Sequence, residues 1–103
     1  MRHMIRHVIK LGHYGDFMQD MAAWNVEAQR LGLPAYRVWE SQFGAVQEVF
    51  TTADFESIDA HYAAFEGAHS DEAFAAIQAA LSRHFVDGTL HDWWLVEAEA
   101  GPT

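Results

Sequence analysis

Histidines are the residues of this chain whose number most suggests chemistry. The 103 residues include seven histidines and no cysteine. His3 and His7 are four positions apart, a spacing that brings two metal ligands together on a helix but separates them by roughly 13 Å on a strand. The alternating residues around them indicate a strand, so we expect no chelate there and expect His3 to be exposed. No HExxH motif or compact set of histidines and carboxylates occurs elsewhere, so no metal site is predicted unless distant residues assemble one.

His69 is a candidate for acid–base chemistry. It lies in EGAHSDEAF, between two helical stretches and close to the start of the second. The dipole at a helix N-terminus disfavours the positively charged imidazole. A neutral imidazole at neutral pH suits a general base, although an ordinary loop histidine is the alternative.

Aromatic residues, which make up 14% of the chain, are the candidates for a binding pocket. Tyr36, Trp39, Tyr62 and Trp93 could together wall a pocket for a flat, apolar ligand. Core packing and a subunit interface are the alternative for each of them.

Several classes of function are excluded or disfavoured. No serine lies in a GxSxG setting, and there is no phosphate-binding loop or GxGxxG motif. The formal net charge is −9, from six basic and fifteen acidic residues, so a nucleic-acid partner and an anionic membrane surface are not expected. No apolar run approaches the roughly 20 residues that span a bilayer, and the N-terminus is too charged for a signal peptide. We therefore expect a cytoplasmic protein.

Hydrophobic periodicity predicts the elements that position these side chains. The alternation from Met4 to Leu11 indicates a strand, and a helical stripe follows, with Asp16 as its N-cap and Gly32 after its last turn. Asp20 and Asn25 lie off that stripe and are expected at the surface. Further strands are predicted over residues 35–42, 45–52 and 89–98, with a turn at Gly44. A second helical region is expected to start at Asp54, with the apolar stripe Phe55, Ile58, Tyr62 and Phe65, to break at Gly67 and to restart at Ser70.

The order of these elements is βαββαβ. It predicts an α+β, ferredoxin-like fold with a four-stranded antiparallel sheet, formed by one domain over residues 1–100 and followed by a disordered tail, 101–103. Both faces of the strands carry large apolar residues, as in the neighbours Trp93 and Trp94, but the chain has helices for only one face. A second copy must then cover the other face, so we expect a homodimer.

Two segments resemble a known superfamily. MIRHVIKLG resembles the opening strand of the dimeric α/β barrel (Dabb-like) families, which begin with an apolar–basic–His–apolar run. YRVWESQFGAVQEVFTTADFESIDAHY resembles the NIPSNAP-type branch, where an R-V-aromatic strand, a glycine turn and an F-E-S helix entry recur. The resemblance covers nearly the whole chain in element order and implies two sheets that close into a barrel, with a cavity between the sheet and the long second helix.

The resemblance also implies roles for two histidines. In cyclase-like members the histidine of the first strand lines the cavity, and His7 matches it. Some members carry an H-P-A-H stretch whose last histidine is a general acid or base; this chain keeps Ala68 and His69 but lacks the first histidine and the proline. Because Ile5, His7 and Ile9 form the more apolar face of their strand, His7 is equally interpreted as a packed structural residue.

Members of the superfamily range from cofactor-free monooxygenases and polyketide cyclases to haem-handling proteins, so the fold alone does not assign an activity. The first interpretation is a cofactor-independent cyclase, isomerase or monooxygenase that uses His7 and His69 on a small apolar or aromatic metabolite. The alternative is a non-catalytic homodimer of the NIPSNAP type that binds a ligand or has a structural role. A third interpretation is haem binding through His7 or His69.

Overall fold

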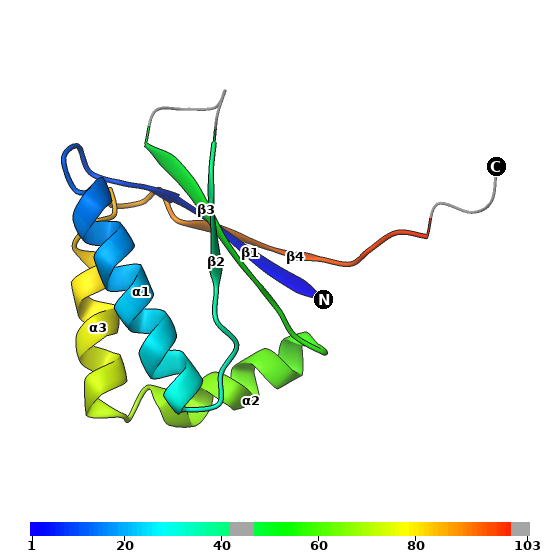
Figure 1. Cartoon of the computed structure of the whole chain (residues 1–103). Helices are drawn as coiled ribbons and strands as arrows, with labels where there is room; N and C mark the ends of the chain where they lie inside the picture. Colours follow the sequence, from blue (N-terminus) through cyan, green and yellow to red (C-terminus); the bar gives the residue numbers. More distant parts are fainter. Residues whose placement is uncertain (42–46, 100–103) are drawn as a thin grey trace.

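A computed structural model describes residues 1–41 and 47–99 of the chain. Its antiparallel sheet has the strand order β2-β3-β1-β4 (Figure 1). The strands are Arg2–Val8 (β1), Arg37–Glu40 (β2), Glu48–Asp54 (β3) and His91–Leu95 (β4). The helices are Tyr14–Arg30 (α1), Ile58–Ala68 (α2) and Glu72–Ser82 (α3). The α+β, ferredoxin-like fold predicted from the sequence is thereby confirmed.

The alternation in β1 decides which side chains meet the helices. His3, His7 and Ile9 are buried on the helix side of the sheet, because successive strand residues point to opposite faces. Across the ladder, His3 lies opposite Ala53 and His7 opposite Val49. The helix side of β1 therefore carries two histidines within an otherwise largely apolar layer.

The first helix begins before the predicted N-cap. His13 occupies the cap position and makes no side-chain hydrogen bond there, whereas Asp16 lies in the first turn, where a carboxylate favours the helix dipole. The predicted core stripe is confirmed, since Phe17 and Trp24 are buried. Gly32 adopts a left-handed φ of 79°, as expected just after the helix.

The start of α2 corrects the prediction that Asp54 caps it. Asp54 is the last residue of β3 and pairs with Arg2 at 2.8 Å, while the Ser57 hydroxyl accepts the backbone N–H of Ala60 as the cap. The face that α2 turns inward also differs from the predicted stripe. His61 packs toward the sheet, and Tyr62 is 64% exposed.

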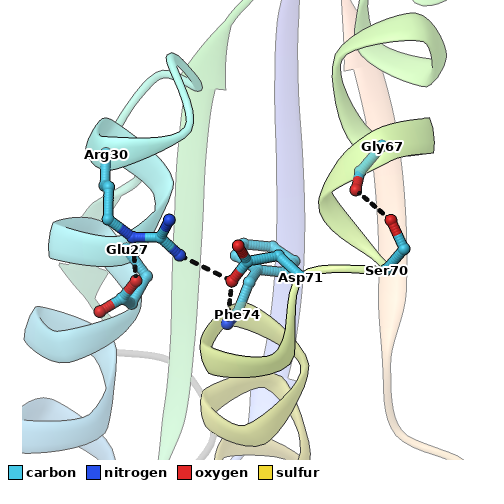
Figure 2. A network of polar contacts seen from close by, with 6 residues as sticks. All are labelled: Glu27, Arg30, Gly67, Ser70, Asp71 and Phe74. Carbon is cyan, nitrogen blue, oxygen red and sulfur yellow. Dashed lines mark hydrogen bonds and ion pairs between the residues drawn. The ribbon is translucent and has the colours of Figure 1, made fainter.

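An ion-pair network joins the end of α1 to the start of α3 (Figure 2). Arg30 donates to Glu27 and to Asp71, both at 2.6 Å. The same Asp71 carboxylate accepts the backbone N–H of Phe74 and so caps α3, while the Ser70 hydroxyl donates to the carbonyl of Gly67. The break predicted near Gly67 and Ser70 is therefore a boundary between two helices that is fixed on both sides.

Two predicted features, the turn at Gly44 and the tail at 101–103, lie outside the described residues. Within residues 1–41 and 47–99, no helix combines the length and apolar character needed to cross a membrane.

Candidate functional site

A cluster of polar and aromatic side chains lies where β1 and β4 meet α2. His3 is at its centre and is only 6% exposed, so the expectation of an exposed His3 is wrong. The strand begins at Arg2, two residues before the predicted start at Met4. His3 therefore lies between Ala53 and Trp94 on the helix side of the sheet. A residue near the N-terminus is thus part of the interior.

Tyr36, His3 and Asp92 form a chain of hydrogen bonds. Nδ1 of His3 is 2.7 Å from the hydroxyl oxygen of Tyr36, and Nε2 is 3.1 Å from a carboxylate oxygen of Asp92. An ionised carboxylate can only accept, so Nε2–H donates to it, and Nδ1 of a neutral ring accepts the Tyr36 hydroxyl proton. The order of carboxylate, imidazole and hydroxyl is that of an activated acid–base relay.

Packing holds both rings of this chain in place. The imidazole of His3 stacks on the indole of Trp94, with centroids 4.6 Å apart and planes inclined by 13°. Tyr36 is held by Asn25, whose amide accepts its backbone N–H and donates to its carbonyl, both at 2.9 Å. The prediction that Asn25 is a surface residue is therefore wrong, because its side chain fixes the segment that leads into β2.

His61 of α2 adds a second imidazole. Its ring meets those of His3 and Trp94 edge to face, with centroids 4.9 and 5.0 Å away. Nδ1 of His61 is buried and has no hydrogen-bond partner among the described residues. Burial lowers the pKa of His61, a positive charge on His3 would lower it further, and the charge of Asp92 raises it. The cluster therefore contains a neutral imidazole with an unused nitrogen.

Tyr36 acts in the cluster as a neutral phenol. Burial, helped by the negative charge of Asp92, raises the pKa of Tyr36 well above its usual range. The hydroxyl therefore stays protonated at neutral pH and donates to Nδ1 of His3 when that nitrogen carries no proton.

His7 lies on the same side of β1 but in a different environment. Its Nε2 is 3.1 Å from the Thr51 hydroxyl, and its ring stacks on Phe85 at 4.4 Å. His7 is 7% exposed, and burial lowers its pKa to about 4, which keeps the ring neutral at neutral pH. The contacts are those of a packed ring, but Nδ1 of His7, like that of His61, is buried with no hydrogen-bond partner among the described residues.

His69 is exposed at the C-terminal end of α2, and its ring lies 6.3 Å from Phe65 and 6.2 Å from Phe74. It shares none of the aromatic neighbours of His7, so the two histidines are not brought together as one pair. A hollow of about 450 Å³ runs along α2, and its lining includes Tyr62, Phe65 and His69. Because Phe65 also contacts His61 at 4.8 Å, this hollow adjoins the cluster.

The four aromatic residues predicted to line a pocket are divided between surfaces. Tyr36 is buried in the cluster, and Tyr62 is exposed on α2. Trp39 and Trp93 lie on the side of the sheet away from the helices, which we call the open face. Its large apolar residues are half-buried or exposed in the single chain: Met4, Val8, Trp39, Phe50, Trp93 and Leu95.

A second chain of polar contacts joins α1 to the segment after α3. Nε2 of His84 is 2.7 Å from the Asp20 carboxylate, and its Nδ1 is 3.1 Å from Nδ1 of His13. Asp20 is therefore not the free surface residue that the sequence predicts. Among the described residues, no three metal-ligating side chains come together here or elsewhere.

The sequence contained only weak signals for the main cluster. His3 continues the alternation of Ile5 and His7 by one more step, and His61 lies four residues before Phe65 on the inward stripe of α2. Nothing in the sequence links Asp92 to these residues, because its contact with His3 spans 89 positions.

Comparison with known proteins identifies the fold. No family model matches the sequence, and no curated protein is significantly similar to it. Among solved structures, an uncharacterized NIPSNAP domain protein from Burkholderia xenovorans has a TM-score of 0.80 at 15% identity, over 99% of this chain and 98% of that one. A NIPSNAP family protein from Agrobacterium tumefaciens has a TM-score of 0.79 at 14% identity, over 98% and 95% of the two chains.

A putative antibiotic biosynthesis monooxygenase from Caulobacter crescentus is also similar, with a TM-score of 0.72 at 13% identity over 95% of this chain and 89% of that one. The resemblance noted in the sequence is thus confirmed at the level of the fold. The chain has the ferredoxin-like α+β fold found in NIPSNAP domain proteins and in antibiotic biosynthesis monooxygenase-like proteins.

Proposed function

We propose that this chain forms a homodimeric α/β barrel that transfers protons on a small, flat, uncharged molecule without a cofactor. The observation that carries the proposal is the Tyr36–His3–Asp92 chain beside the unpartnered nitrogen of His61. In this proposal, His3 and His61 take the role that the sequence suggested for His7 and His69.

His61 is the general base. Its neutral ring accepts a proton from a carbon or hydroxyl of the substrate, and the charge of Asp92 favours the imidazolium that forms. His3, held between Tyr36 and Asp92, fixes the position of the carboxylate and supplies the ring against which His61 packs.

The surroundings of the cluster indicate the substrate class. The rings of His3, Trp94, Phe55 and Phe65 pack around His61, and Phe65 also lines the hollow along α2. A flat molecule bound in that hollow would stack on Phe65, next to His61. The carboxylate of Asp92 bonds to His3 and acts through its charge on His61, which disfavours an anionic substrate. An apolar or aromatic compound with an acidic C–H bond fits these conditions.

Hydrogen exchange tests the proposal without knowledge of the natural substrate. Benzoylacetone, a flat aromatic diketone, is incubated with the protein in D2O, and loss of the C–H signal between its carbonyls is followed by NMR. We expect His61→Gln to slow the protein-dependent exchange by about 10²-fold or more, the usual contribution of a general base. His13→Gln, whose ring contacts His84 and none of the rings of the cluster, is the matched control and should exchange at the wild-type rate. Equal rates for wild type and His61→Gln would refute the assignment of the base.

The homodimer is supported by the open face. Trp39 is 43% exposed and Leu95 is 41% exposed, although both lie in a sheet, where apolar side chains are normally covered. The same observation supports the second candidate, a non-catalytic dimer that binds a ligand or has a structural role. If the protein is a dimer but does not accelerate hydrogen exchange in any diketone or aromatic ketone tested, this second function is favoured.

A further inference from the structure

Consecutive residues of strand β4 point alternately to the His3 cluster and to the open face. Asp92 and Trp94 contact His3, whereas Trp93 between them points to the open face, opposite Met4. Strand β1 repeats the arrangement, with His3 in the cluster and Met4 on the open face. Any contact that fixes or displaces Trp93 therefore acts on the strand that carries Asp92 and Trp94.

Few contacts within the chain hold β4. It is an edge strand of five residues that pairs only with β1 in the described sheet, and its residues are exposed or half-buried. The side chain of Asp92 is 55% exposed at its contact with His3. Water competes with an exposed contact of this kind, so the position of the strand decides whether it persists.

The balance of charges on the open face indicates that a second copy of this chain packs against it. Arg2 pairs with Asp54 and Arg6 with Glu48 on this face, and Arg37 lies 4.7 Å above the ring of Trp39. The face thus carries no excess of acid, although the whole chain has a net charge of −9. Two acidic chains repel least where their local charge is balanced, and a self-complementary pairing buries the apolar residues of both.

We propose that pairing of two open faces fixes β4 and thereby stabilises the His3–Asp92 contact, which the single chain forms through an exposed carboxylate. This inference rests on the function proposed above and adds its regulation: dissociation of the dimer lowers the fraction of chains in which Asp92 is bonded to His3.

The test uses a substitution that breaks the interface far from the cluster. Val8 lies on the open face at the opposite end of β1 from His3, and in Val8→Lys the new ammonium can pair with the neighbouring Glu48 in a single chain. Val26→Lys, on the outer surface of α1 where Val26 is 64% exposed, is the matched control. Oligomeric state is measured by light scattering, folding by circular dichroism, and the His3–Asp92 contact by the solvent-protected Nε2–H signal in histidine-labelled protein. His3→Gln assigns that signal.

We expect the wild type and Val26→Lys to be dimers with the signal, and Val8→Lys to be a folded monomer in which the signal is weaker. A folded Val8→Lys monomer that keeps the signal at wild-type strength would overturn the coupling and leave the acid–base site intact. A wild-type dimer without the signal would instead contradict the site itself, and the inference with it.

A dilution series of the wild type provides a second measurement that needs no substitution. The signal per chain should fall in proportion to the dimer fraction. A signal that stays constant while the dimer dissociates, or a wild type that is monomeric and keeps the signal, would overturn the coupling.

Discussion

Individual histidines in this chain differ because their surroundings differ. His3 has a hydrogen-bond partner on each ring nitrogen, His61 has a buried nitrogen without a partner, and His69 is exposed. His7 is bonded to Thr51 and stacked on Phe85 within the core. Residue type alone therefore assigns no role, and the partners of each ring decide what it can do.

The pH dependence of stability tests the environment of His7. Burial lowers its pKa from 6.5 to about 4 in the folded chain, so the unfolded chain binds the proton more readily between these values. Stability from this group is fully present above pH 6.5 and is lost as the pH falls toward 4, with a total of about 3 kcal/mol. Urea unfolding of wild type and His7→Gln from pH 7 to pH 4 should show a smaller loss in the variant. His91→Gln, on exposed β4, should keep the wild-type slope; equal slopes for His7→Gln and wild type would contradict the burial argument.

Helix α2 shows how packing selects the face that meets the site. The helix is capped by Ser57, and its packing turns His61 toward His3 and leaves Tyr62 in solvent. The sequence pattern placed Tyr62 on the apolar stripe with Phe55 and Phe65. In the structure Phe55 precedes the helix, and the inward residues include His61 and Phe65, which are four positions apart and so lie on one face.

Removal of this cap should weaken the helix that carries His61. Ser57→Ala leaves the backbone N–H of Ala60 without its partner and should lower the free energy of unfolding by about 1 kcal/mol. Ser82→Ala, which removes an exposed hydroxyl that bonds to the carbonyl of Gln78, is the matched control and should change it much less. Chemical denaturation of both variants gives the comparison, and an equal effect would show that the Ser57 cap has no special importance.

At the scale of the whole molecule, the two faces of the sheet differ in what covers them. The helix side encloses the histidines, and the open face presents Trp39, Trp93 and Leu95. A four-stranded sheet with helices on one face leaves the other for a partner, which is the physical basis of the proposed dimer.

A dimer should make thermal stability depend on protein concentration. Because association of folded chains stabilises them by mass action, the Tm of the wild type should rise as the chain is concentrated. The Tm of the Val8→Lys variant should not. Scanning fluorimetry over a hundredfold range of concentration checks this, and a wild-type Tm that does not change would argue against the dimer.

The sequence by itself determined the order of elements and the four strands, and it showed that His7 shares a strand face with Ile5 and Ile9. These features depend on local periodicity, which the chain carries in neighbouring residues. It also indicated that one set of helices could not cover both apolar faces of the sheet.

Only the tertiary structure brought His3, Tyr36 and Asp92 together. Tyr36 and Asp92 are 33 and 89 positions from His3. The contact with Asp92 depends on the register of β1 with β4, and the contact with Tyr36 depends on the hydrogen bonds that Asn25 makes to the backbone of Tyr36. Register and packing are set by interactions between distant segments, and no local pattern encodes them. For that reason the histidines of this chain could be counted in the sequence, but the partners that His3 has on each ring nitrogen could not be identified there.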